Sequence, residues 1–137
     1  MADGAAIVER EDVRVMFRRT TDDQQAITRT WADVEAAVGS LKGRKFYGAF
    51  NVTTSEYWVC VQLRKGDDPG ALGLEEGTLP GGRYARERLE GNPPAVYGLI
   101  KPAFDRLAEQ RSDEDVSRPS IEFYRRHDMI DLLLPIA

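Results

Sequence analysis

The sequence predicts an α+β fold made of two β-α-β-β units, in which two antiparallel sheets, each covered by one helix, meet around a central groove. Strand-like segments rich in β-branched and aromatic residues alternate with two segments of helical periodicity, and the order strand-helix-strand-strand occurs twice. A glycine-rich linker at 65–77 separates the two occurrences. We therefore expect one domain over 1–137, with pseudo-repeats at about 12–64 and 78–136.

The first unit begins with a predicted strand at Val13–Arg19. Capping groups at Thr21-Asp22-Asp23 open a helix to about Val38, and Gly39 ends it. The apolar residues of this helix recur at helical spacing and so predict one stripe packed on a sheet. They are Ile27, Trp31, Val34 and Val38.

A hairpin completes the first unit. Its strands are expected at Lys45–Thr53 and Glu56–Leu63, which are rich in β-branched and aromatic residues and are joined by Thr-Ser turn chemistry.

The second unit begins with a predicted strand at Thr78–Leu89. Asn92 is expected as the N-cap and Pro93 as the first residue of a helix to Gln110. Pro102 should kink this helix or split it after Ile100, because proline removes a helical hydrogen bond.

A polar, acidic loop at Ser112–Arg118 follows the second helix. Two closing strands are expected at Ser120–Arg126 and Met129–Ile136, joined by a tight turn at His127-Asp128.

Composition excludes several classes of protein. The net charge of −4 argues against direct nucleic-acid binding, which needs a basic face. No apolar run has the length of a membrane span, and Met1–Arg10 lacks the features of a secretion signal, so a cytoplasmic location is expected. Cys60 is the single cysteine, which excludes an internal disulfide and a thiol-based zinc cluster.

Three short motifs occur in an unusual order: Leu79-Pro80-Gly81-Gly82-Arg83-Tyr84-Ala85, then Gly91-Asn92-Pro93-Pro94, then Ser120-Ile121-Glu122-Phe123-Tyr124. Together with the closing Leu134-Pro135-Ile136, they resemble the GyrI-like (gyrase-inhibitor-like) small-molecule-binding domain. That domain also forms the effector domain of multidrug-sensing transcription regulators. The resemblance implies the two-unit architecture with its groove, and it places the family's ligand-facing carboxylate at Glu122.

Glu122 and Tyr124 are two apart on a predicted strand, so their side chains leave the same face. If a helix covers Ile121 and Phe123 on the other face, Glu122 points into the groove. A carboxylate among aromatic rings can neutralise a cationic ligand, and the rings add cation–π attraction. The alternative is a solvated strand residue that pairs with Arg125 or Arg86.

Further rings could line the groove, although a small core buries such rings too. We favour Trp58 and Tyr84 as ligand-binding residues, then Tyr47. Tyr57 stays open, because adjacent Tyr57 and Trp58 must point to opposite faces. Tyr97 is expected as a partly exposed ring at the flank of the second helix.

No cofactor or metal site is predicted. His127 is the one histidine and lies on a predicted hairpin tip, without the further ligands that a metal requires. The Gly81-Gly82 pair precedes a strand rather than a helix, so it is read as a turn and not as a phosphate site. Asp113-Glu114-Asp115 lacks the spacing of a calcium loop.

Three functions follow, in order of preference. The first is a stand-alone binding module that senses or sequesters aromatic, amphipathic, cationic compounds through Glu122. The second is a hydrolase of strained or electrophilic xenobiotics with Glu122 as acid or base, as the resemblance implies for some relatives. The third is a protein partner that inhibits gyrase by contact. A separately encoded regulator is a further candidate partner, and the choice between monomer and dimer stays open.

Overall fold

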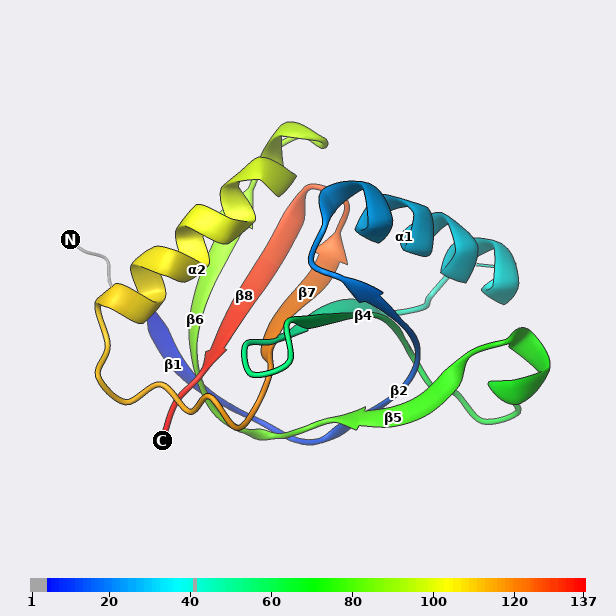
Figure 1. The fold of residues 1–137 in the computed structure, drawn as a ribbon, viewed down its shortest axis with the longest axis horizontal. Helices are drawn as coiled ribbons and strands as arrows, with labels where there is room; N and C mark the ends of the chain where they lie inside the picture. The colour runs from blue at the N-terminus through cyan, green and yellow to red at the C-terminus, as the bar shows by residue number, and fades with distance from the viewer. Residues whose placement is uncertain (1–4, 41) are drawn as a thin grey trace.

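The computed structural model describes residues 5–40 and 42–137. In this part of the chain, eight strands form one antiparallel sheet, and the helices α1 and α2 lie over the same face of it (Figure 1). The strand order is β1-β6-β8-β7-β3-β4-β2-β5. The elements in chain order are β1 (Ala6–Arg10), β2 (Val13–Thr21), α1 (Gln24–Val38), β3 (Phe46–Asn51), β4 (Glu56–Gln62), the short 3₁₀ helix η1 (Gly70–Leu72), β5 (Glu75–Leu79), β6 (Gly82–Glu90), the 3₁₀ helix η2 (Ala95–Leu99), α2 (Ile100–Glu109), β7 (Ser120–Arg126) and β8 (Met129–Pro135).

Helix α1 follows the sequence prediction closely. The Asp23 carboxylate accepts a hydrogen bond of 3.0 Å from the Ala26 amide and caps the helix, because the first amides of a helix lack intrahelical partners. Gly39 ends the helix at φ 79°, a conformation that favours glycine. Val34 is fully buried against the sheet, as the apolar stripe predicts.

The predicted strand at 78–89 is wrong as one element, because it consists of the end of β5 and most of β6. Strand β5 pairs with β2, whereas β6 pairs with β8 and β1. The chain crosses between them at Gly81, whose amide donates a 2.6 Å hydrogen bond to Asp12 Oδ1. An added Cβ at Gly81 would lie 2.5 Å from the Arg10 carbonyl oxygen, so glycine permits this crossing.

The predicted second helix is divided, as Pro102 indicated, but its start is different. Residues Ala95–Leu99 form η2, and α2 begins at Ile100 rather than at Pro93. Pro102 therefore lies in the first turn of α2. The amides of the first turn have no acceptor within the helix, so the missing amide proton of proline costs no helical hydrogen bond there. The proline fits the helix at this position.

The expectation of two separate sheets is wrong. Strand β3 pairs with β7, with Gly48 directly opposite Glu122, and this pairing joins the two halves into one sheet. The order β3-β4-β2 on one side mirrors β7-β8-β6 on the other, and each side carries one helix. That the chain arose by duplication stays a prediction.

The two faces of the sheet have different cores. On the face without helices, the curl face, side chains from both ends of the sheet meet in one cluster, so the sheet curls around them. Its buried members are Val15, Phe17, Tyr47, Ala49, Cys60, Leu79, Tyr84, Ile121, Phe123 and Leu133. On the helix face, one cluster lies under α2 and another under α1. Among the described residues, no helix has the length and apolar character needed to cross a membrane.

Candidate functional site

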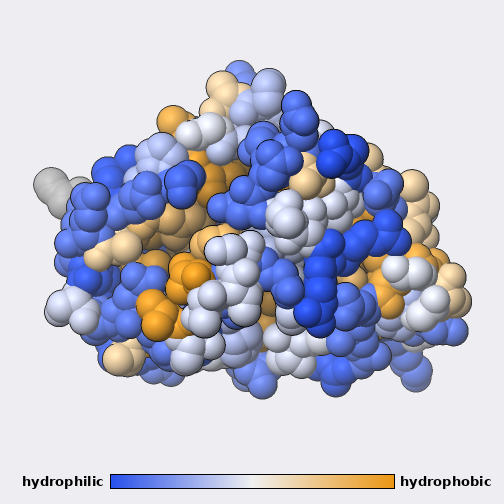
Figure 2. All heavy atoms as spheres, viewed as in Figure 1, coloured by the Kyte–Doolittle hydropathy of each residue, from blue (hydrophilic) through white to orange (hydrophobic). Residues whose placement is uncertain are grey.

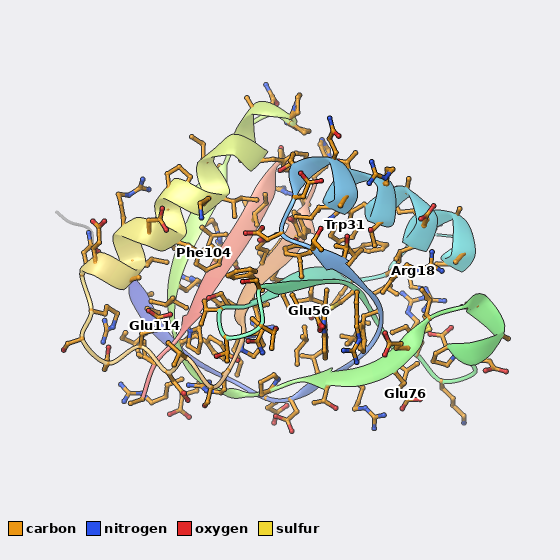
Figure 3. All side chains as sticks on the ribbon, in the orientation of Figure 1. Arg18, Trp31, Glu56, Glu76, Phe104 and Glu114 are labelled. Atoms are coloured by element: carbon orange, nitrogen blue, oxygen red, sulfur yellow. The ribbon has the colours of Figure 1, made fainter. Side chains whose placement is uncertain are left out.

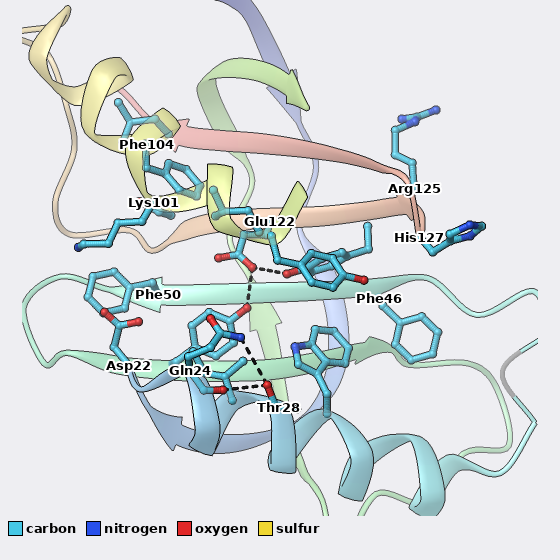
Figure 4. A pocket seen from close by; sticks show the side chains of 18 of the residues that line it. Asp22, Gln24, Thr28, Phe46, Phe50, Lys101, Phe104, Glu122, Arg125 and His127 are labelled. Atoms are coloured by element: carbon cyan, nitrogen blue, oxygen red, sulfur yellow. Dashed lines mark hydrogen bonds between the residues drawn. The ribbon is translucent and has the colours of Figure 1, made fainter. Parts of the chain in front are cut away.

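A cavity of about 970 Å³ lies between α1 and α2, over the middle of the sheet (Figure 4). Its floor comes from β3, β4 and β7, and its walls from the two helices and η2. Trp31 extends from α1 and Phe104 from α2 on the helix sides that face the sheet (Figure 3). In the space-filling view, apolar residues show between the polar outer surfaces of the two helices (Figure 2). The volume suits an organic molecule of drug size.

Glu122 lies on the floor of this cavity and is only 8% exposed. Its Oε1 atom accepts two hydrogen bonds, from the Tyr57 hydroxyl at 2.6 Å and from the Tyr124 hydroxyl at 2.5 Å. The other oxygen, Oε2, accepts no hydrogen bond from the described residues and is not a fully enclosed atom. One oxygen is therefore held by the protein, and the other is left for the cavity.

Gly48 on β3 makes room for this arrangement. It pairs directly with Glu122 on the neighbouring strand, so a side chain at this position would point to the same face. An added Cβ would overlap the Tyr57 hydroxyl and lie 2.7 Å from Glu122 Oε1. The hydrogen bond between Tyr57 and Glu122 thus depends on a glycine at position 48.

The electrostatic surroundings of Glu122 favour its neutral form. Burial raises the pKa of this carboxyl, the two phenol hydrogen bonds oppose the rise, and the negative charge of Asp22 adds to it. Burial and the nearby carboxylate also raise the pKa values of Tyr57 and Tyr124 well above the ordinary value, so both phenols stay protonated donors. Among the described residues, no Arg or Lys forms a salt bridge with Glu122.

Aromatic rings surround the carboxyl group. The Tyr124 ring meets the Trp31 ring edge-on, with 5.3 Å between the ring centroids. The centroid of the Tyr97 ring lies 6.4 Å from that of Tyr124. Trp31 is also 5.9 Å from Phe46. Phe50 and Phe104 line the cavity as well. Such rings can pack on apolar groups and hold a cation by its attraction to their faces.

The structure brings together some of the predicted site residues and separates others. Glu122 and Tyr124 line the cavity, and so does Tyr57, which the sequence left open. Trp58, Tyr84 and Tyr47, which we favoured as ligand-binding residues, do not line this cavity. Tyr47 and Tyr84 are buried members of the cluster on the curl face, and Trp58 packs against it.

Strand alternation explains the separation. Gly48 pairs with both Glu122 and Val59, so the adjacent residues Tyr47 and Trp58 must point to the opposite face. Glu87 and Glu122 both pair with Leu132, so their side chains lie on the same face of the sheet. Tyr84 is three positions before Glu87 on β6, so its side chain points to the opposite face.

On the curl face the three rings have structural partners. The Trp58 ring stacks on Phe17 with centroids 3.7 Å apart, and the Tyr47 ring stacks on Phe123 at 4.9 Å. The Tyr84 hydroxyl donates a 2.5 Å hydrogen bond to the Pro80 carbonyl.

Several residues that line the cavity are not identified by the sequence patterns. Trp31 and Phe104 carry a helical apolar pattern, which indicates a buried face without showing that a cavity interrupts it. Phe46 and Phe50 flank Gly48 in an alternating Phe-x-Gly-x-Phe pattern, and a glycine inside a strand is a signal of close approach by another group.

The described residues contain no cluster of three or more metal-ligating side chains. His127 lies in the β7–β8 turn, as predicted, and borders the cavity there. Cys60 is fully buried on the curl face, and burial raises the pKa of its thiol, which makes it a poor nucleophile.

No protein-family model and no curated protein sequence matches this chain. Solved structures do. An integron cassette protein from the mobile metagenome of Vibrio cholerae superposes with a TM-score of 0.75 at 18% identity, covering 98% of this chain and 96% of its own.

Two further structures share the fold. SAV2435, solved bound to tetraphenylphosphonium, has a TM-score of 0.69 at 15% identity and covers 97% of this chain and 93% of its own. A protein from Staphylococcus aureus MU50 that is named for bacterial transcription regulation has a TM-score of 0.60 at 13% identity, covering 96% of this chain and 97% of its own. The chain thus has the fold of at least one protein that holds a small organic cation.

Proposed function

We propose that this chain binds aromatic, amphipathic cations in the cavity between α1 and α2, as a module for sensing or sequestering them. Glu122 supplies the negative charge, and the rings of the cavity supply apolar contact and cation–π attraction. The GyrI-like resemblance and the tetraphenylphosphonium bound by SAV2435 support this proposal.

The proposal rests on Glu122, whose carboxyl group is buried beside the cavity without a cationic partner among the described residues. The carboxyl group is buried at 8% exposure, lacks a cationic partner among the described residues, and keeps Oε2 free toward a cavity. A buried, unpaired carboxylate is unfavourable in the empty protein. A cation that enters the cavity removes this penalty, so part of its binding free energy comes from the pairing.

Shape-matched ions of opposite charge test the proposal. Tetraphenylphosphonium and tetraphenylborate have nearly the same size, and they differ in the sign of the charge at their centre. Thermal unfolding of the wild type should be shifted to higher temperature by the phosphonium and left unchanged by the borate. The phosphonium shift should be lost in Glu122→Gln.

Glu76→Gln is the control for net charge, because Glu76 is exposed on β5, pairs with Arg14 and does not line the cavity. This variant should retain the full shift. Equal stabilisation by the two ions, or an unchanged phosphonium shift in Glu122→Gln, would contradict the proposal.

A further inference from the structure

The rings of the cavity form two groups, with Glu122 between them. On β3, Phe46 and Phe50 line the cavity, and Gly48 lies between them on the same strand face, opposite Glu122. Four residues along a strand span about 14 Å, so the two phenylalanines stand well apart on either side of the carboxyl group. Figure 4 shows Phe46 and Phe50 on opposite sides of Glu122.

The tryptophan end of the cavity comprises Trp31, Phe46, Tyr97 and Tyr124, whose rings are linked by centroid distances of 5.3 to 6.4 Å. The phenylalanine end comprises Phe50 and Phe104, which both line the cavity and both lie on the side of Glu122 away from Phe46 (Figure 4).

The helical segment from η2 to α2 contributes one ring to each end of the cavity. Tyr97, in η2 just before α2, belongs to the tryptophan end, and Phe104, two turns further along, belongs to the phenylalanine end.

Of the charged residues that line the cavity, the carboxylates Glu122 and Asp22 lie at its middle and at the phenylalanine end, and Lys101 also lines that end (Figure 4). Glu122 lies between the two groups of rings, and Asp22 lines the cavity beside Phe50 (Figure 4). A ligand that uses both aromatic ends therefore has its centre next to Glu122.

We propose that the favoured ligands are onium ions whose positive centre lies between two aryl groups, one packed in each end of the cavity. This inference rests on the proposed function and narrows its ligand class. A cation with one aryl group uses the tryptophan end, which has more rings, and leaves the phenylalanine end without a ring partner.

Three ammonium ions and two kinds of variant test the inference by calorimetric titration. Benzyltrimethylammonium has one ring, dibenzyldimethylammonium has two, and benzylhexyldimethylammonium replaces the second ring by an alkyl chain of similar apolar size. The dibenzyl ion should bind the wild type about two- to twelvefold more tightly than the benzylhexyl ion, because one aromatic pair contributes about 0.5–1.5 kcal/mol beyond the burial of its area.

Phe104→Leu should remove this advantage and change the affinity of benzyltrimethylammonium by less than about twofold. Phe50→Leu provides an independent variant of the same end in case Phe104→Leu is misfolded. Trp31→Leu is the matched control at the other end, and it should weaken all three ions alike.

An equal affinity of the dibenzyl and benzylhexyl ions for the wild type would overturn the inference while leaving cation binding intact. The same conclusion would follow if Phe104→Leu and Phe50→Leu weakened all three ions equally. Failure of all three ions and of tetraphenylphosphonium to bind would overturn the proposed function together with the inference.

Discussion

The two faces of the sheet are built from the same strands but are filled in different ways. On the curl face, rings pack on rings, as in the stacked pairs Phe17–Trp58 and Tyr47–Phe123. On the helix face, the rings stand around a cavity of about 970 Å³ with the Glu122 carboxyl on its floor. The curl face therefore provides stability, and the helix face has space left for a ligand.

The difference between the two faces comes from adjacent residues of β3 and β7, whose side chains point to opposite faces of the sheet. On β3, Tyr47 faces the packed core, whereas its neighbour Gly48 faces the cavity and leaves space for the Tyr57 hydroxyl. On β7, Phe123 belongs to the core, while Glu122 lies under the cavity. Strand alternation thus places the packed rings on one face of the sheet and the cavity on the other.

The largest expected effect is on stability, and it distinguishes the two faces. Leu133→Ala on the curl face should lower the free energy of unfolding by about 2–5 kcal/mol, because a fully buried side chain leaves a cavity. Phe104→Ala beside the open cavity should cost about 1 kcal/mol or less. Urea unfolding of both variants measures this, and equal losses would contradict the distinction.

Gly48→Ala should disturb the floor of the cavity from within the sheet. The added methyl group overlaps the Tyr57 hydroxyl, so we expect a loss of about 1–3 kcal/mol in stability and weaker cation binding. Gly70→Ala is the control, since its Cβ would meet nothing closer than 3.7 Å. Urea unfolding and titration with tetraphenylphosphonium test both variants, and wild-type affinity in Gly48→Ala would show that Tyr57 need not hold Glu122.

Tyr57→Phe and Tyr124→Phe each remove one of the two hydrogen bonds to Glu122 Oε1. Each should cost about 1 kcal/mol of stability near neutral pH, the usual net value of one hydrogen bond. Each should also raise the pKa of Glu122 further, because the lost donor favoured its charged form. Carboxyl titration by NMR checks the direction, and an unchanged pKa would refute the role of the phenols.

The smallest expected effect is the dependence of the free energy of unfolding on pH that Glu122 confers. Because its pKa is raised in the folded state, the folded protein holds this proton more tightly than the unfolded chain. Its contribution to stability should fall as pH rises from the ordinary carboxyl pKa of 4.5 through the raised value. Stability differences between wild type and Glu122→Gln, measured from pH 4 to 8, should therefore move in favour of the variant as pH rises.

The proposed cation binding should have the opposite dependence on pH, because only the charged carboxylate pairs with a cation. The affinity of the wild type for tetraphenylphosphonium should increase as pH rises through the raised pKa of Glu122. An affinity that stays constant over this range would exclude Glu122 as the titrating partner.

Local signals predicted much of the fold. The Asp23 cap and Gly39 delimit α1, and alternation places Glu122 with Tyr124. Local signals do not indicate β1 and indicate only the end of β5, because both are short strands at the sheet edges that pair with residues distant in sequence.

The site was predicted only in part for the same reason. Alternation shows that Tyr57 and Trp58 face opposite ways, but it does not show which of the two shares a face with Glu122. That choice depends on the pairing of β3 with both β4 and β7, where Gly48 aligns with Val59 and Glu122. Such long-range register is set by the packing of the whole sheet and leaves little trace in the local sequence.

A crystal structure of the wild type in complex with tetraphenylphosphonium would test whether Glu122 and the cavity rings hold the cation. We predict that the phosphorus lies in the cavity between α1 and α2, next to Glu122 Oε2, with phenyl groups among the cavity rings. A phosphonium bound elsewhere on the protein, or bound in the cavity away from Glu122, would contradict the account.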